Sequence, residues 1–177
     1  TLFDDLYQGE NGHLAICSPP LRTPEDAKAL WKGLQDGTIL LTGSDDCTFD
    51  VDEKSMFLEK NPDGTWKQDF TKVVNGLSGL EVRLPILLSE GVNKGRLSIN
   101  KVCALTSTNI AKIYGCFPQK GIIAPGSDAD IVVVDMDKEV TLSKDVLHNN
   151  ISYCLHDGMH IKGYPIMTIA RGQVIVE

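Results

Sequence analysis

Short apolar runs and one helical pattern alternate at the start of the chain. Residues 13–17 are mostly apolar and precede a Ser-Pro-Pro loop, and residues 38–43 combine leucine with β-branched side chains, so both runs predict buried strands. Between them, Thr23 and Pro24 open a segment that keeps its apolar residues on one face as far as Gly37, which predicts a helix. A strand, a helix and a second strand in this order predict a βαβ unit with a parallel strand pair.

The middle of the chain predicts three short amphipathic helices. The first covers residues 80–89 and starts late because of Pro85, and the second begins at Ser98. The third begins at residue 107 or 108 and ends at Gly115. We expect these helices to form the flank of a barrel.

The pattern changes after residue 116, where turn residues and β-branched runs replace the helical spacing. The predicted strands cover residues 131–135, 166–170 and 173–176. Arg171 and Gly172 between the last two runs predict a tight hairpin. This shift predicts a domain boundary between a barrel part, residues 1–116, and a small β module, residues 117–177.

Composition narrows the class of protein. The 177 residues carry a net charge of -7 and no cluster of Lys and Arg, which argues against nucleic acid as a partner. No apolar run approaches the ~20 residues of a membrane span, so we expect no membrane association. The five cysteines are odd in number and irregularly spaced, which favours reduced thiols and a cytoplasmic location.

Two stretches carry candidate chemistry. The run at 38–43 leads directly to Asp45 and Asp46, and the carboxyl ends of buried parallel strands are where α/β proteins bind ligands, so Asp45 is a candidate metal ligand or general base. The alternative is that both aspartates cap a loop. The glycine-rich bend at 75–79 either brings backbone close to a ligand or is an ordinary turn before a helix.

Five segments follow one another in a distinctive order. They are SPPLR at 18–22, GSDxCxF at 43–49, NGxxGxExR at 75–83, TSTNxAK at 106–112 and KGxIxxGSDAD at 120–130. In this order they resemble the C-terminal half of the dihydropyrimidinase and hydantoinase group of the amidohydrolase superfamily. The resemblance implies an α/β fold: the C-terminal part of a (β/α)8 TIM-like metal-dependent hydrolase barrel, followed by part of a small β-sandwich domain.

The resemblance also implies an activity and its residues. It implies a binuclear zinc site at which metal-bound hydroxide opens dihydropyrimidine or hydantoin rings, a step of pyrimidine catabolism, in a homo-oligomer that is usually a tetramer. Asp45 matches the metal ligand that also shuttles the proton, in keeping with zinc lowering the pKa of its water to about 7. Ser18 and Asn75 match the residues that hold the amide and carbonyl groups of the small cyclic substrate, largely through their backbones.

Two departures from the family pattern stand out. Asp46 replaces the histidine that usually follows the metal-ligand aspartate, and the added charge is expected to disturb Asp45 or substrate binding. The HxH pair, the carboxylated lysine and the two further histidines of the family lie upstream of anything that resembles Thr1. The four histidines of this chain match none of them, so we expect surface or core roles for them: His13, His148, His156 and His160.

With one metal ligand instead of the roughly three or four that a zinc site needs, the chain is interpreted as a C-terminal fragment that is inactive by itself. A non-catalytic scaffold or assembly relative of the same fold remains an alternative, because the histidines are absent. A third hypothesis is another cyclic amidohydrolase, such as an allantoinase or a dihydroorotase. The segments at 18–22 and 75–76 favour the dihydropyrimidinase and hydantoinase group over these enzymes.

Overall fold

A computed structural model describes all 177 residues and divides into two compact units. The first unit comprises residues 1–28, 44–81 and 141–159, and the second comprises residues 29–43, 82–140 and 160–177. Each unit is therefore assembled from three segments that lie far apart in the sequence. The domain boundary expected at residue 117 stays a prediction.

Helix α1 (Pro24–Asp36) forms where the sequence predicts it. The Thr23 hydroxyl accepts a hydrogen bond from the backbone N–H of Asp26 at 3.3 Å, and the Asp26 carboxylate accepts one from the Thr23 N–H at 3.2 Å. This reciprocal pair satisfies two N–H groups at the start of the helix. Gly37 follows with a φ of 88°, a conformation that glycine adopts without steric cost.

Two composite helical segments follow in the second unit. Helix α3 (Arg83–Ile86) continues into a π-helical turn, Leu87–Asn93, and helix α4 (Ile99–Cys103) continues through a second one, Ala104–Thr108, into α5 (Asn109–Ile113). Ser98 caps α4 as expected, since its hydroxyl accepts from the backbone N–H of Lys101.

The separate helix predicted from residue 107 or 108 is wrong, because the chain stays helical from α4 to α5. The hydroxyl groups in this region bond to carbonyl oxygens and cap no new helix. Thr106 donates to Val102 at 2.8 Å, and Thr108 donates to Gly121 at 2.7 Å.

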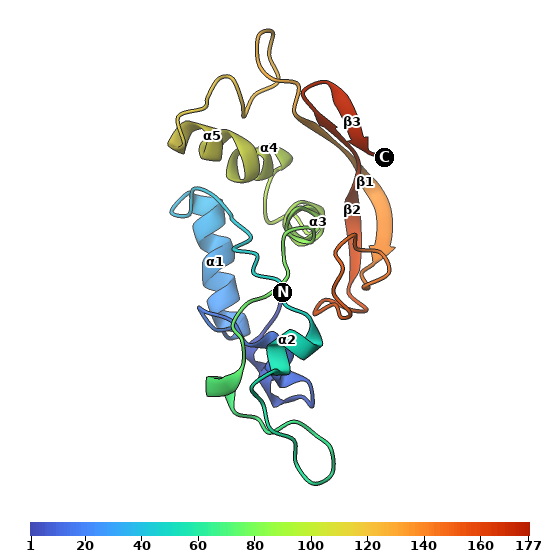
Figure 1. The fold of residues 1–177 in the computed structure, drawn as a ribbon. Helices are drawn as coiled ribbons and strands as arrows, with labels where there is room; N and C mark the ends of the chain where they lie inside the picture. The colour runs from blue at the N-terminus through green and yellow to red at the C-terminus, as the bar shows by residue number, and fades with distance from the viewer. The chain divides into compact units, whose positions relative to one another are not determined.

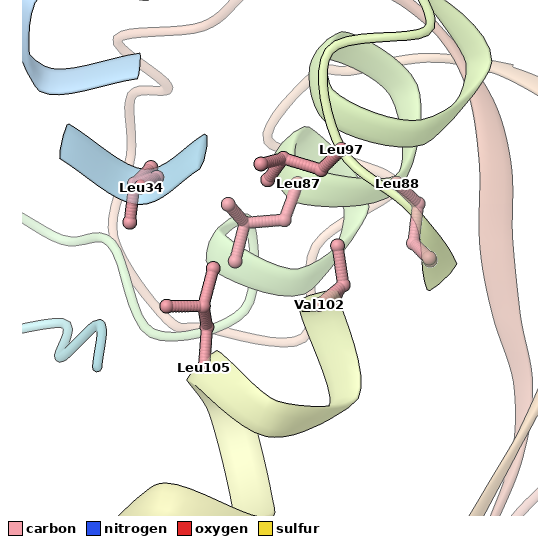
Figure 2. Packing of buried hydrophobic residues seen from close by; sticks show 6 residues of the cluster. All are labelled: Leu34, Leu87, Leu88, Leu97, Val102 and Leu105. Carbon is pink, nitrogen blue, oxygen red and sulfur yellow. The ribbon is translucent and has the colours of Figure 1, made fainter. Parts of the chain in front are cut away.

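The apolar core of the second unit lies between these helices (Figure 2). Its buried members are Leu34, Leu87, Leu88, Leu97, Val102 and Leu105. Trp31 and Ile39 pack against this cluster from outside it. Burying one leucine side chain stabilises a fold by about 1.5–3 kcal/mol, so these residues account for much of the unit's cohesion.

Three strands form one sheet in the order β1 (Ile131–Thr141), β2 (His160–Ala170) and β3 (Gln173–Val176) (Figure 1). Strands β2 and β3 are antiparallel. The turn between them has φ values of 49° at Arg171 and 81° at Gly172, as a tight hairpin of two residues requires. The predicted hairpin is therefore confirmed. The three strands make a single sheet, so the expected second layer of a β-sandwich is not formed by these residues.

Strand β2 packs directly against the helical segment that begins with α3. Gly163 has a φ of 94°, which favours glycine, and a Cβ there would be in tight contact with the Cβ of Leu88 at 3.3 Å. The Asn93 amide donates to the carbonyl of Lys162 at 2.6 Å, and the Lys162 N–H donates to the Ser89 hydroxyl at 3.1 Å.

The strands predicted at residues 13–17 and 38–43 are not formed. Residues Gly12–Ala15 make a 3₁₀ turn, and residues 40–50 have no regular secondary structure. The reason lies in the backbone partners: the Ile39 N–H donates to Gly33 at 2.9 Å and the Thr42 N–H to Leu105 at 3.1 Å. A parallel strand needs a neighbouring strand for these groups, and here helices supply the acceptors instead.

The first unit contains the start of α1, the short helix α2 (Val51–Ser55) and three 3₁₀ turns, Asp4–Gln8, Gly12–Ala15 and Phe70–Lys72. Its buried apolar residues are Leu14, Ala15, Leu58, Val73 and Leu142. In the whole chain, none of the helices combines the length and apolar character that crossing a membrane requires.

Candidate active site

Two of the predicted site residues meet in the first unit. The Ser18 hydroxyl donates a hydrogen bond to the side-chain oxygen of Asn75, with 3.2 Å between the oxygens, although the residues are far apart in sequence. Both residues line a cavity of about 520 Å³, whose apolar walls include Ile16, Phe70 and Val73. A mostly apolar cavity with a few polar groups is typical of a small-molecule site.

Asp45 lies on a neighbouring loop of the same unit and is exposed. Its φ of 47° places its backbone in the left-handed region, which aspartate tolerates better than most residues. Its carboxylate takes part in no hydrogen bond or ion pair within the chain. The structure therefore leaves Asp45 free to bind a ligand, but does not bring it into contact with Ser18 or Asn75.

The loops that carry Asp45 and Asn75 are joined by backbone and side-chain hydrogen bonds. The Asp46 carboxylate accepts from the backbone N–H groups of Gly79 at 2.8 Å and Leu80 at 2.9 Å. The Cys47 N–H donates to the carbonyl of Leu77 at 3.1 Å. Asp46 thus anchors the glycine-rich loop.

The electrostatics of Asp46 reflect this anchoring. Partial burial alone would raise its pKa, but the hydrogen bonds from Gly79, Thr48 and Leu80 outweigh burial and hold the pKa below its usual range. Hydrogen-bond donors of the neighbouring loop therefore stabilise the negative charge of Asp46. The sequence predicts instead that this charge disturbs Asp45 or substrate binding.

Gly76 makes the contact between the two loops possible. Its φ is 147°, and a Cβ at this position would lie 2.3 Å from the carbonyl oxygen of Cys47. Only glycine fits such an approach of two backbones. The bend at 75–79 therefore packs its backbone against Cys47 of the same chain, and its approach to a ligand stays a prediction.

Lys54 on α2 is a residue that the sequence analysis did not single out. Its side chain is fully buried, and its ammonium donates to the carbonyl of Ile16 at 2.8 Å and to the carbonyl of Gly76 at 2.6 Å. Helix α2 is held by a capping box between Asp50 and Glu53. A single lysine one helical turn after an N-cap carries no sequence signal that distinguishes it from an exposed lysine.

The segment 141–159 forms hydrogen bonds with Phe49 and Asp50, which follow the Asp45 loop. The Asp50 carboxylate accepts from the N–H of Ser152 at 3.1 Å, and the Tyr153 hydroxyl donates to the carbonyl of Phe49 at 3.1 Å. Burial, together with the Asp50 charge, raises the pKa of Tyr153 to about 12, so its phenol stays protonated at neutral pH. His148 and Glu81 add a contact of 2.6 Å between Nδ1 and a carboxylate oxygen.

The histidines occupy core or surface positions, as expected. His13 and His156 are buried, and burial lowers the pKa of both, to about 4 for His156. His148 and His160 are exposed and lie beside glutamates. No group of three or more His, Cys, Asp or Glu side chains is arranged to hold a metal ion, so Asp45 is the one predicted ligand that these residues supply.

Comparison with known proteins identifies the family. Residues 7–175 match the model of the amidohydrolase family. The chain therefore belongs to the amidohydrolase family. Its relatives are dihydropyrimidinases and hydantoinases, which confirms the group that the five sequence segments predicted.

Three relatives illustrate the similarity. Dihydropyrimidinase 2 of Caenorhabditis briggsae is 44% identical over 161 residues, covering 90% of this chain and 29% of the relative. D-phenylhydantoinase of Escherichia coli is 37% identical over 169 residues, covering 96% of this chain and 35% of the relative. The crystal structure of dihydropyrimidinase from Brevibacillus agri superimposes with a TM-score of 0.91 and 38% identity, covering 100% of this chain and 37% of that structure.

These matches bear on fold and length. The structural likeness supports a hydrolase of the TIM-barrel type, although the part of the barrel that these residues form is not defined by it. The chain spans about a third of the length of the relatives it matches, with coverage between 29% and 35%. The activity of the whole relatives is therefore considered for this chain as a proposal.

Proposed function

We propose that this chain is a portion of a metal-dependent hydrolase that opens cyclic amides of the dihydropyrimidine and hydantoin type. The observation that carries the proposal is the meeting of Ser18 and Asn75 at one cavity, beside a loop that presents the free carboxylate of Asp45. The names of the relatives, dihydropyrimidinase and D-phenylhydantoinase, support cyclic amides as the substrate class.

Ser18 and Asn75 position the substrate. A flat cyclic amide presents N–H donors and carbonyl acceptors around its rim, and backbone groups on two facing loops complement such an edge. The exposed polar side chains of both residues lie at the cavity, which is large enough for a small ring.

Asp45 is the metal ligand and the proton carrier. A carboxylate oxygen is a suitable ligand for zinc, and a carboxylate without other partners is available for it. The metal, when bound, activates the attacking water. With the metal bound, the Asp45 carboxylate would take up the proton of the attacking water and would pass it to the ring nitrogen of the substrate.

The rest of the metal site lies outside these residues. Zinc sites use roughly three or four protein ligands, and this chain offers one. The family resemblance places the remaining ligands of a binuclear zinc site upstream of Thr1. We therefore propose that the 177 residues do not hydrolyse cyclic amides by themselves, and that the active protein is a cytoplasmic tetramer.

The test compares ring opening by the full-length protein with that of its Asp45→Asn variant. Hydrolysis of dihydrouracil and of hydantoin is followed by the loss of ultraviolet absorbance, and bound zinc is measured by mass spectrometry. We expect activity in the full-length protein, a loss on the order of a hundredfold or more in Asp45→Asn, and no activity in the 177-residue chain.

Asp52→Asn is the matched control, because Asp52 is exposed, lies in the same unit and has no hydrogen-bond partner among the described contacts. It is expected to keep full activity. A full-length protein that folds and binds zinc but opens neither ring would overturn the proposal. A folded protein without zinc or activity would favour the scaffold relative instead.

A further inference from the structure

The most unusual side chain of the first unit is Lys54. It is fully buried, yet no carboxylate pairs with its ammonium. The two groups within hydrogen-bond distance are carbonyl oxygens, those of Ile16 at 2.8 Å and Gly76 at 2.6 Å. Burying an ammonium without a counter-charge is costly unless hydrogen bonds compensate for the lost water, and here the two carbonyl oxygens supply them.

These two carbonyls belong to the two loops that meet at the cavity. Ile16 stands two residues before Ser18, and Gly76 directly follows Asn75. The Gly76 N–H also donates to the carbonyl of Ile16 at 3.2 Å. The ammonium and this backbone hydrogen bond together join the loops behind the contact between the Ser18 and Asn75 side chains.

We propose that Lys54 is a positioning residue that fixes the separation of the Ser18 and Asn75 loops, so that their backbone groups face one cyclic amide. This inference rests on the proposed function and adds a residue to it. Lys54 lies behind the loops and acts through them, so it touches neither the substrate nor the metal ligand Asp45.

Lys54 carries its charge in spite of its surroundings. Burial lowers the pKa of Lys54 to about 8, while the thiols of Cys17 and Cys47 nearby act in the opposite direction, so the ammonium is the main form at neutral pH. Burial, and after it the charge of Lys54, lowers the pKa of His13.

The experiment compares Lys54→Met with Lys67→Met in the full-length protein. Methionine keeps most of the apolar stem and removes the ammonium, while Lys67 is an exposed lysine of the same unit that pairs with Glu59. Two readouts are taken: KM and kcat for dihydrouracil, and hydrogen–deuterium exchange of the backbone over residues 75–80.

In Lys54→Met we expect KM to rise by about tenfold or more with kcat and zinc content little changed, because loop position is lost while the metal centre is kept. Exchange at residues 75–80 should accelerate, and Lys67→Met should match the unchanged protein. An unaltered KM together with unaltered exchange would overturn the inference. If the unchanged protein opens no ring, the proposed function fails, but exchange still decides the role of Lys54.

A chemical rescue separates the loss of charge from misfolding. In Lys54→Ala, n-propylammonium has the shape and charge of the deleted group, and n-propanol has a similar shape without the charge. Restored exchange protection and a restored KM with propylammonium alone are expected. Equal restoration by propanol, or no restoration by either, would assign Lys54 to packing and overturn the inference.

Discussion

The carboxylate of Asp46 accepts a hydrogen bond from the backbone N–H of Gly79, with 2.8 Å between oxygen and nitrogen. The same oxygen accepts from the N–H of Leu80, and the other oxygen accepts from the Thr48 hydroxyl at 2.6 Å. The family resemblance predicts a histidine at this position. In the structure, Asp46 closes the loop that carries Asn75 against the loop that carries Asp45.

Replacing Asp46 by histidine is therefore expected to weaken the site, although it restores the residue that the family resemblance expects. A histidine at this position cannot offer two carboxylate oxygens to three donors. We expect the free energy of unfolding to fall by about 1 kcal/mol, the usual value of such a capping interaction, and KM to rise. Urea unfolding and steady-state kinetics measure the two effects. Asp52→His is the control, and a gain of activity in Asp46→His would contradict the anchoring role.

Gly76→Ala is expected to be far more damaging than Gly64→Ala. Both glycines have positive φ, 147° and 89°, but a Cβ at Gly64 meets nothing within 4 Å, whereas at Gly76 it meets the Cys47 carbonyl oxygen at 2.3 Å. The backbone penalty alone is about 1 kcal/mol and applies to Gly64→Ala. The overlap at Gly76 should bring the loss of stability to about 3 kcal/mol or more.

Urea unfolding of both alanine variants measures this difference in the free energy of unfolding. Similar losses in the two variants would mean that the loop moves to accept the added methyl group and that the close approach of Gly76 to Cys47 is not required.

The sequence predicted those elements whose formation depends on residues close to one another in the chain. Helix α1 with its Thr23 cap and the hairpin at Arg171 and Gly172 formed as expected, because caps and tight turns are decided by neighbouring side chains and by φ. The strands at 13–17 and 38–43 did not form, because a parallel strand depends on partners that the periodicity of its own residues does not reveal.

The same distinction holds for the candidate site. Ser18 and Asn75 were predicted by resemblance, and the structure brings their side chains to 3.2 Å, although their binding roles stay predictions. The roles of Asp46 and Lys54 could not be predicted, because each depends on backbone groups of loops that are distant in sequence. A charged residue in a polar segment shows no pattern that separates a buried anchor from an exposed side chain.

Leu105→Ala is expected to destabilise the second unit strongly. Leu105 is 0% exposed and belongs to the apolar cluster between the helices (Figure 2). Removing a buried leucine leaves a cavity, and the cost is about 2–5 kcal/mol. Ile113→Ala is the control, because Ile113 is 57% exposed and should change stability by less than about 1 kcal/mol. Thermal unfolding of the two variants would contradict this packing if their midpoints moved equally.

Acid should destabilise the first unit through His156. Burial lowers the pKa of His156 from 6.5 to about 4, so the folded state keeps the imidazole neutral while the unfolded state takes up a proton below pH 6.5. The stability that this difference contributes is fully present above pH 6.5 and is lost as the pH falls through 4. Between pH 6.5 and 5 the loss amounts to about 2 kcal/mol.

The measurement is the free energy of unfolding from urea titrations at a series of pH values, for the unchanged protein, His156→Gln and His160→Gln. His160→Gln is the matched control for removing an imidazole, because His160 is exposed beside Glu139. Glutamine does not titrate, so the free energy of unfolding of His156→Gln should fall less steeply between pH 6.5 and 4. The difference in slope should be near the value for one bound proton, about 1.4 kcal/mol per pH unit. Equal slopes for all three proteins would show that His156 takes up its proton without unfolding, and that its burial does not oppose the charge.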